Sequence, residues 1–343
     1  YLIKVSENVT LRISNDRIIN LPIPISLTAG WNIISYPAQG FNDIEVVLAS
    51  LLNSQNLYTV FNEAGNVYVP DYVTGGNAIN SIDIFQPGEG YYVKVIDNDN
   101  LIIDEPTGLL QDDFIVDGTA NSNRSCGHYA PIWNPDCNPD INPFSPMTIV
   151  MDNALWNGVV LEEGDEIGVF DGDICVGTYT VPSGGFPSNT DVLIKTSKDD
   201  GGNNGFTEGE SVIFRVWRQS QVVDIDADID VFTDPSGDPI EPEFEGLLIP
   251  RVQVQVYPPS TARDFNASGQ QNQISLSWYR PSTGNYQIYN YPEAGSYNAV
   301  TFEINRDGSL LIDNLDATGY INTGLDNNRI YEYDITAHSI VGQ

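Results

Sequence analysis

The sequence predicts a mainly β protein built from tandem β-sandwich-like modules, one of which carries a short helix. Three observations lead to this fold class. Aromatic residues are abundant, with 18 Tyr, 13 Phe and 5 Trp, and such residues favour strands. The 30 Gly and 21 Pro supply residues for many turns. Several long stretches alternate apolar and polar residues with a period of two, which is typical of half-buried strands.

The opening of the chain recurs 90 positions further on. "YLIKVSENVTLRI" begins at Tyr1, and the similar "YYVKVIDNDNLII" begins at Tyr91. Tandem units of about 90 residues account for this self-similarity. We therefore expect residues 1–20 to be the C-terminal tail of a preceding unit and residues 21–111 to be a complete copy.

Local signals predict the elements of this complete unit. "LPIPISLTAGWNIISYPAQG" predicts a strand that leads into a turn at Gly30 to Asn32. "FNDIEVVLASLLNS" has apolar residues at helical spacing, and Asn42 with Glu45 makes a capping-box pattern. "LYTVFNEAGNVYVPDYV" predicts a hairpin with its turn at Ala64 to Asn66. "PGEGYYVKV" predicts a turn and the closing strand.

The motifs "GWNIISYP", "GNVYVP" and "PGEGYYVKV" carry a family resemblance. The unit 21–111 resembles the GWN-type β-modules that recur in large secreted bacterial proteins. Residues 112–256 show period-two strands separated by Gly and Asp turns, which predicts an acidic β-sandwich. Their pattern "GDEIGVFDGDICVG" is similar to an uncharacterised β-module of gliding, marine-type bacteria, seen beside secretion-signal and fibronectin-like domains.

Residues 257–343 resemble a fibronectin type III domain. "ARDFNASGQQNQISLSWYRP" matches its first two strands, with Trp278 in the usual core position. "RIYEYDITAHSIVGQ" matches a later strand, and the resemblance implies one more strand after it. We therefore expect this domain to be incomplete at its last strand, and the chain to be a window onto a much longer protein.

The charge balance restricts the partners. The chain has 14 Lys and Arg against 47 Asp and Glu, a formal net charge of −33. Nucleic acid and anionic lipid need basic patches, so neither is expected as a partner. No apolar run is long enough to predict membrane insertion. Two interpretations of the acidity stay open: a surface that keeps the protein soluble in salty water, and binding of divalent cations at particular loops.

The three cysteines have different surroundings. Cys126 and Cys137 flank the Pro- and Asn-rich loop "CGHYAPIWNPDC", which favours a disulfide between them. Zinc is the alternative because His128 lies in the loop, but two thiols and one imidazole fall short of a tetrahedral set. Cys175 lies in a strand pattern and is expected to be a small buried residue with a free thiol.

One loop has the composition of a calcium site. "DDGGNNGFTEGE" is rich in oxygen ligands and glycine turns, although its spacing is not that of an EF-hand. The candidate ligands are Asp199, Asp200, Asn203, Asn204 and Glu208. Calcium is the only cofactor that the sequence suggests.

Other acidic patterns favour structural roles. In "VVDIDADIDV" every second residue is Asp, so these four carboxylates share one strand face, which we expect to be an exposed edge face. The clustered acids Glu163, Asp165 and Glu166 are expected to lie in solvated turns. The chain has only two histidines, and the "GxSxG" and "HExxH" motifs are absent. We therefore expect no catalytic residues and no enzyme activity.

These patterns and resemblances predict a non-catalytic structural segment of a giant modular secreted cell-surface protein. The segment would form the shaft of an adhesive extracellular fibre or appendage of a bacterium. Its expected partners are neighbouring modules of the same chain, further copies that self-associate into a fibre, and a cell-surface glycan or protein.

The alternative is an accessory or glycan-binding region of a secreted polysaccharide-degrading enzyme. A glycan-binding region would show exposed Trp or Tyr side chains in a line. Trp133 and Trp156 are the loop-placed candidates, whereas we expect Trp31, Trp217 and Trp278 to be core residues.

Overall fold

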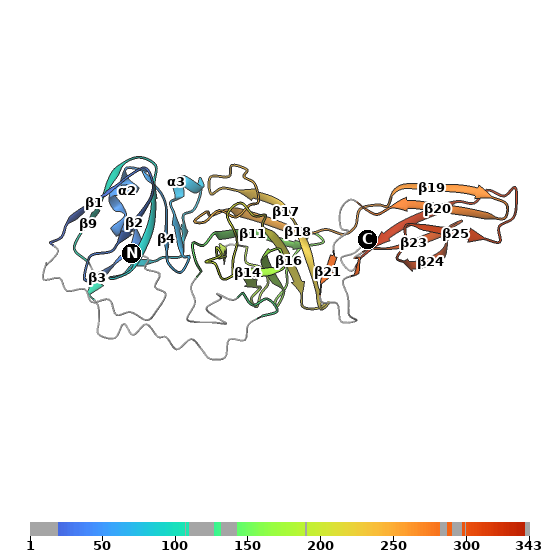
Figure 1. The fold of residues 1–343 in the computed structure, drawn as a ribbon, viewed down its shortest axis with the longest axis horizontal. Helices are drawn as coiled ribbons and strands as arrows, with labels where there is room; N and C mark the ends of the chain where they lie inside the picture. The colour runs from blue at the N-terminus through green and yellow to red at the C-terminus, as the bar shows by residue number, and fades with distance from the viewer. Residues whose placement is uncertain are drawn as a thin grey trace.

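The computed structural model describes residues 20–106, 108–109, 127–131, 143–188, 191–281, 287–289, 297–298 and 300–339. Over these residues the fold is mainly β, with three short helices. The strands form three groups that follow one another along the longest axis of the molecule (Figure 1). We call them the N-terminal region (residues 20–109), the central region (127–256) and the C-terminal region (257–339). None of the helices in the described ranges has the length and apolar character needed to cross a membrane.

The N-terminal region contains one five-stranded sheet and two smaller ones. The sheet has the order β2-β8-β4-β5-β6, while β1 pairs with β9, and β3 pairs with β7 and β10. A core that includes Leu48, Leu51, Phe85 and Tyr91 fills the interior. The elements are β1 (Ile23–Leu27), β2 (Gly30–Ser35), β3 (Gly40–Asp43), α1 (Ile44–Val47), α2 (Ala49–Asn53), β4 (Leu57–Asn62), β5 (Val67–Val69), α3 (Asp71–Thr74), β6 (Ile79–Asn80), β7 (Ile84–Phe85), β8 (Gly90–Val95), β9 (Asp99–Ile103) and β10 (Gly108–Leu109).

The predicted helix is present, but as the two short helices α1 and α2. Its N-cap is Asp43 rather than Asn42, because the Asp43 carboxylate accepts a 2.8 Å hydrogen bond from the Glu45 amide. Asn42 instead lies in β3 and is 2% exposed. The "GWN" stretch is also not a turn: it begins strand β2, and the Asn32 side chain bonds to the preceding turn at Thr28.

The central region is organised around the long strand β17. Its first half pairs with β16 and its second half with β18, and these partners lie on opposite sides of the strand. The strands are β11 (Thr148–Trp156), β12 (Val159–Val160), β13 (Glu166–Asp171), β14 (Ile174–Thr180), β15 (Val192–Lys195), β16 (Ile213–Arg218), β17 (Val223–Thr233) and β18 (Arg251–Val256). The order along the sheet is β12-β11-β18-β17-β16-β13-β14. Apolar side chains from both halves, among them Ile167, Phe214 and Val254, form one large core.

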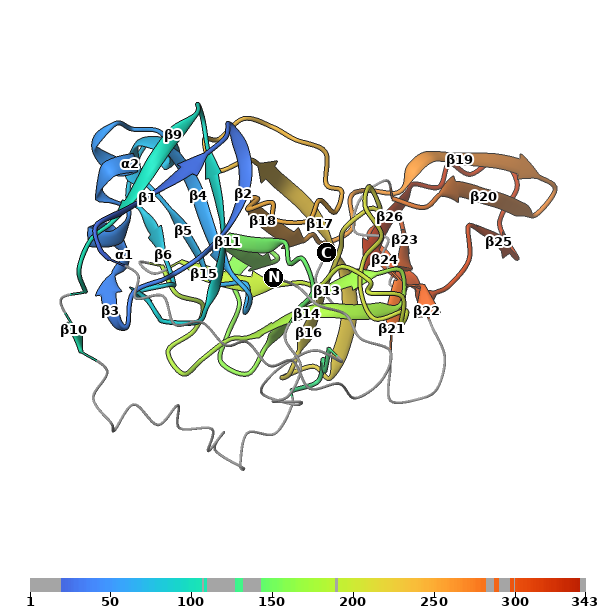
Figure 2. The same ribbon diagram turned by 60° about the vertical axis from the view of Figure 1, so that its left-hand side comes forward.

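The C-terminal region has two three-stranded sheets. One has the order β19-β20-β25 and the other β24-β23-β26. Trp278 is buried between them, edge-on to Phe302 at a centroid distance of 5.3 Å. The strands are β19 (Arg263–Gln270), β20 (Gln273–Tyr279), β21 (Gln287–Tyr289), β22 (Tyr297–Asn298), β23 (Thr301–Arg306), β24 (Ser309–Leu315), β25 (Gly319–Thr323) and β26 (Tyr333–His338). The short strands β21 and β22 lie beside the central region rather than in these two sheets (Figure 2).

The N-terminal and central regions share a small apolar core of their own, which we call the junction core. It consists of Phe61, Val67, Val69 and Ile79 from the N-terminal region with Val150 and Ile249 from the central region. Each of these side chains is at most 2% exposed. Two hydrogen bonds cross the same junction, from Thr148 Oγ1 to the Gly65 carbonyl at 2.8 Å and from Lys195 Nζ to Asn66 Oδ1 at 2.7 Å. These two regions are therefore packed against each other and not merely linked.

Candidate functional site

A group of polar and aromatic side chains lies on the outer face of the central sheet. Pairing across three neighbouring strands places Glu166 of β13, Trp217 of β16 and Asp224 of β17 in one row. Because alternate residues of a strand share a face, the row two residues along has the same orientation, and it contains Arg215 and Asp226. The opposite face of these strands carries the apolar residues of the central core.

Residues 127–131 lie across this outer face and hold both carboxylates of the first row. The two oxygens of Glu166 accept the backbone amides of His128 and Tyr129, at 2.6 and 2.9 Å. The Tyr129 hydroxyl donates to Asp224 Oδ1 at 2.5 Å. We call Glu166, Asp224, His128 and Tyr129, together with Trp217, the anchor cluster.

His128 completes the anchor cluster. Its ring stacks on the Trp217 ring at a centroid distance of 3.9 Å and an interplanar angle of 7°. Its Nε2 atom lies 3.4 Å from Asp224 Oδ2. The His128 side chain is 23% exposed and that of Asp224 only 3%, so the imidazole covers the carboxylate from solvent.

Two glycines make this close packing possible. A Cβ atom at Gly127 would overlap the carboxylate of Glu166. A Cβ atom at Gly168 would meet the Phe170 ring and lie 3.0 Å from the ring of Tyr129. Real Cβ atoms do not approach so closely, so a larger residue at either position would displace the Glu166 carboxylate or the Phe170 and Tyr129 rings from this arrangement.

The charges around the anchor cluster are paired or neutral. Arg215 is 8% exposed in its side chain; it donates to Asp173 at 3.0 Å and lies 4.2 Å above the Phe170 ring. Burial, reinforced by the Asp224 carboxylate, raises the pKa of Tyr129, so its hydroxyl is protonated at neutral pH. Burial likewise raises the pKa of Cys175 to about 12, which leaves a protonated and weakly nucleophilic thiol.

The anchor cluster overturns two expectations. Asp224 does not lie on an exposed edge face, because β17 has neighbours on both sides and residues 127–131 cover it. Asp165 and Glu166 are also buried, at 1% and 4% exposure, rather than solvated. Asp165 accepts a hydrogen bond from Arg218 at 2.7 Å and one from the Gln219 amide at 3.0 Å. Only the far end of the acidic face, at Asp230, is exposed.

The predicted calcium loop spans a turn between β15 and β16, and one carboxylate oxygen of Asp199 and one of Asp200 accept amides within the loop. Asp199 Oδ1 accepts the amides of Gly201 and Asn204, and Asp200 Oδ1 accepts the Gly202 amide. Asn203 has a left-handed backbone with φ of 55°. Glu208 pairs with Lys198 at 2.8 Å.

The pKa values of the carboxyl groups in and near this loop shift in different directions. Desolvation acts to raise the pKa of Asp199, but hydrogen bonds from backbone amides lower it overall. Nearby, desolvation and the Glu210 carboxylate raise the pKa of Asp171. Over the described ranges, no group of three or more His, Cys, Asp or Glu side chains is arranged to hold a metal ion. Calcium binding by the predicted ligands stays a prediction.

Only one of the two cysteine predictions falls on residues that the structure describes. Cys126 and Cys137 lie outside the described residues, so their disulfide stays a prediction that peptide mapping without reductant would test. Cys175 is a free thiol, as expected, but the residue is only partly buried. Its sulfur lies 3.4 Å from the Gly177 carbonyl oxygen.

The tryptophans differ from the expected division into core and surface. Trp156 is 5% exposed in β11, whereas Trp31 is 36% exposed on β2, so both expectations were wrong. Trp217 is partly exposed under His128, Trp278 is a core residue as predicted, and Trp133 lies outside the described residues. Trp31 faces Lys94 across the β2–β8 pair, and the Lys94 ammonium lies 4.5 Å from the Tyr58 ring and 5.6 Å from the Trp31 ring. These three side chains form a short row, which we call the aromatic row.

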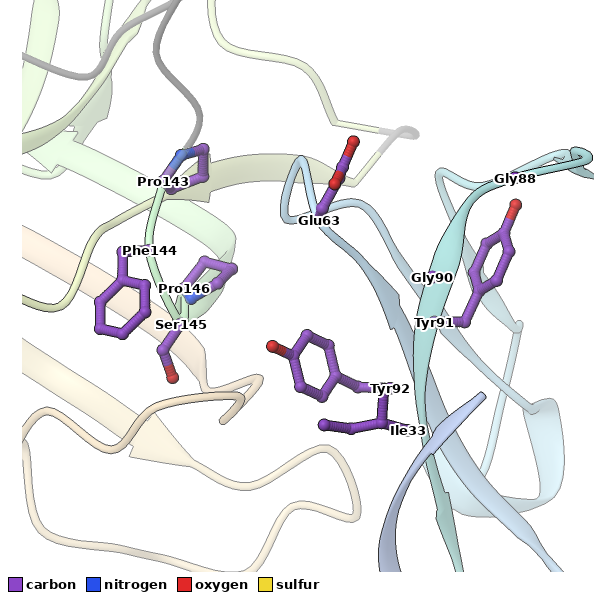
Figure 3. Close-up of a pocket in the computed structure, with 10 residues that line it drawn as sticks. All are labelled: Ile33, Glu63, Gly88, Gly90, Tyr91, Tyr92, Pro143, Phe144, Ser145 and Pro146. Carbon is purple, nitrogen blue, oxygen red and sulfur yellow. The ribbon is translucent and has the colours of Figure 1, made fainter. Parts of the chain in front are cut away.

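A cleft of about 220 Å³ lies between the N-terminal and central regions. Figure 3 shows Ile33 and Tyr92 projecting from one wall toward Phe144 and Pro146 on the other, while Tyr91 points away on the far side of β8. Ile33 is 66% exposed and Phe144 42% exposed. The cleft is therefore an opening of mixed character beside the junction core, because Glu63 and Ser145 line it together with these apolar side chains.

Comparison with known proteins adds no relative: no family model matches the chain, and no curated protein matches it. Its function must therefore be argued from the residues themselves. Sequence reasoning missed the anchor cluster, because its members come from three separate stretches of the chain. The one signal in the sequence was the presence of Tyr129, an aromatic residue, directly after His128 in the stretch between Cys126 and Cys137.

Proposed function

We propose that this chain is a non-catalytic structural segment of a giant modular secreted cell-surface protein of a bacterium. It would form part of the shaft of an adhesive extracellular fibre or appendage. In this role the modules transmit force and set distance, and binding activity would reside elsewhere in the protein.

The junction core is the observation that carries this proposal. Bending between the N-terminal and central regions would expose side chains such as Phe61, Ile79 and Val150, which are at most 1% exposed. Full exposure of one such side chain costs about 1.5–3 kcal/mol. The two regions therefore behave as one stiff body, which is what a shaft requires and a flexible tether does not.

The strand orders support the finer architecture. Two three-stranded sheets, β19-β20-β25 and β24-β23-β26, enclose Trp278, in keeping with a fibronectin type III arrangement. In the central region the two halves of β17 belong to ladders that surround one core, in keeping with a β-sandwich. Tandem β-modules of this kind suit an extended chain.

The anchor cluster supports a structural rather than a catalytic role. Both oxygens of Glu166 accept amides of residues 127–131, and both oxygens of Asp224 face side chains of the same segment. A general acid or base must instead be free to exchange a proton with a substrate. These carboxylates therefore attach one segment to the sheet.

The net charge of −33 bears on the assembly. A strongly acidic surface keeps neighbouring rods soluble, and salt screens their repulsion within about 8–10 Å at physiological ionic strength. Parallel copies can therefore associate laterally in salty water, and a cell-surface glycan or protein would be the adhesion partner.

The test compares two valine substitutions in the full chain. Val150→Asp places a charge in the junction core, whereas its neighbours Ile149 and Met151 face the central core and are left intact. Val159→Asp, at a position that is 58% exposed, is the matched control. Small-angle scattering should show a stiff, extended particle for the wild type and the control, and a broader distribution of shapes for Val150→Asp.

A milder variant, Lys195→Met, removes the hydrogen bond to Asn66 and should loosen the junction without threatening folding. A freely hinged wild-type particle would contradict the proposal. So would hydrolysis of a glycan or peptide that a single carboxylate substitution abolishes.

A second candidate, glycan binding, is favoured by the aromatic row. Trp31 and Tyr58 flank Lys94 on one face of the sheet, and apolar ring faces with an adjacent polar group are common in ligand sites. Titration with soluble polysaccharides, monitored by Trp fluorescence, should show saturation that Trp31→Ala abolishes and Ile33→Ala leaves unchanged. The absence of saturation across neutral and acidic polysaccharides would remove this candidate.

A further inference from the structure

The C-terminal region contributes a strand to the central sheet. In the connection between β20 and β23, strand β21 pairs antiparallel with β17, with Tyr289 opposite Asp224 and Ile288 opposite Ile225. Strand β22 then pairs with β21. Asp224 and Ile225 also pair with β16, so β21 occupies the other side of β17. Figure 2 shows β21 and β22 between the central sheet and the C-terminal strands.

Strand β21 pairs with the same side of β17 as β18 does, beyond the point at which β18 ends. On β17, the pairing with β18 ends at Asp228, which lies opposite Gln255. The pairing with β21 starts three residues earlier in the chain, at Ile225. Without β21, this half of β17 would present unpaired amides and carbonyls among the residues that the structure describes. Such an edge invites pairing with another chain, and covering it with a strand removes that hazard.

We propose that β21 and β22 form an intramolecular strap that locks the C-terminal region onto the central region. Main-chain hydrogen bonds supply the attachment, as they do when an extended peptide adds a strand to a sheet edge. Because both partners belong to one chain, the effective concentration of the strap at β17 is high and few additional contacts are needed.

A second attachment point makes the strap effective. The linker after β18 begins with Tyr257, whose hydroxyl donates to Asp230 Oδ1 at 2.7 Å. Asp230 and Ile225 are five positions apart on β17, roughly 17 Å at about 3.3 Å per residue. The Tyr257 contact precedes β19 in the chain and the β21 pairing follows β20, so the C-terminal region is attached to β17 at two points of its own chain, and this restricts rotation about the linker more than one attachment would. This inference does not depend on the proposed function, since an accessory region of an enzyme would be fixed in the same way.

The test removes a backbone donor from the strap in the full chain. Ile288→Pro eliminates an amide hydrogen and disfavours strand pairing. Thr283→Pro, in the same connection but before β21, is the matched control. Neighbouring amides of a strand point to opposite sides, so only one of Asp224 and Ile225 donates to β21 while the other donates to β16. Hydrogen exchange at the amide that faces β21 should become at least about tenfold faster in Ile288→Pro, and small-angle scattering should show a broader range of shapes. The control should resemble the wild type in both measurements.

Three further readouts decide the outcome. Slow exchange in β19 and β20 would show that Ile288→Pro still folds its own region, and Tyr289→Pro serves as a second variant if it does not. Unchanged exchange and shape in both variants would overturn the strap. Protection of the β17 amide that faces β21 would also overturn it if that protection appeared only in a concentration-dependent oligomer, because the strand would then come from a second copy. A failed strap leaves the Val150 test of the proposed function unaffected, because that test concerns the other junction.

Discussion

The hydroxyl of Tyr129 donates a hydrogen bond to Asp224 across 95 residues of sequence, and both side chains are almost completely buried. The bond joins a short segment to the middle of the central sheet. Asp224 belongs to strand β17, and at this residue β17 also pairs with β21 from the C-terminal region. The first half of β17 is therefore where three parts of the chain meet.

Tyr129→Phe should destabilise the protein by about 1–3 kcal/mol, because Asp224 would lose a hydrogen bond while it remains buried. Urea denaturation followed by circular dichroism measures this difference in the free energy of unfolding. Tyr179→Phe is the control in the same region, since the described part of the chain shows no hydrogen bond to its hydroxyl. Equal effects of the two substitutions would mean that the Asp224 contact contributes nothing specific.

Stability should fall as the pH rises above about 9. The pKa of Cys175 is raised in the folded protein to about 12, so the unfolded chain releases this proton first and alkaline pH favours unfolding. The contribution is fully present below the pKa of the unfolded thiol and is lost as pH rises toward 12. Urea denaturation in the presence of reductant between pH 8 and 10 should show this slope, at most about 1.4 kcal/mol per pH unit.

Cys175→Ala is the control for this pH dependence and should flatten the slope in the same window. Above about pH 10 the raised pKa of Tyr129 adds a second loss of stability with the same sign. An identical slope in wild type and Cys175→Ala would show that the thiol is not the group responsible.

Val222→Asn should stabilise the protein by about 1 kcal/mol. Val222 has a φ of 57°, a left-handed conformation that β-branched residues adopt only with strain and that Asn tolerates. The side chain is 48% exposed, so little burial is lost. Val159→Asn, at an exposed valine in β12, should give no such gain in urea denaturation. A loss of stability in Val222→Asn would mean that the valine makes contacts that outweigh its backbone strain.

Calcium should raise the midpoint of thermal unfolding if the loop 199–208 binds the ion. Binding to the folded state alone contributes about 2.7 kcal/mol at a calcium concentration one hundred times the dissociation constant. Asp199→Asn should abolish the shift. Asp234→Asn is the control, because Asp234 accepts the amides of Ser236 and Asp238 in a similar turn elsewhere. A midpoint that does not respond to millimolar calcium would refute the site.

Local patterns in the sequence predicted much of the secondary structure. The mainly β class, the turn at Ala64 to Asn66 and the position of the helical segment follow from neighbouring residues. Helix caps are harder to assign, because Asn42 and Asp43 are both good caps and only the path of β3 selects Asp43. Burial of Trp278 was predicted from the fibronectin type III resemblance of its stretch, and Trp278 is buried.

The tertiary structure decided which polar and aromatic side chains are covered. Alternation places Asp224 on the polar face of β17, but its burial depends on residues 127–131, which lie about a hundred positions earlier. Trp31 is exposed and Trp156 buried because of which faces neighbouring strands and regions cover. Strand β21 is only three residues long, too short for a periodic signal, and its partner lies in another region of the chain. Period-two patterns report which residues share a face, whereas long-range packing determines what lies over that face.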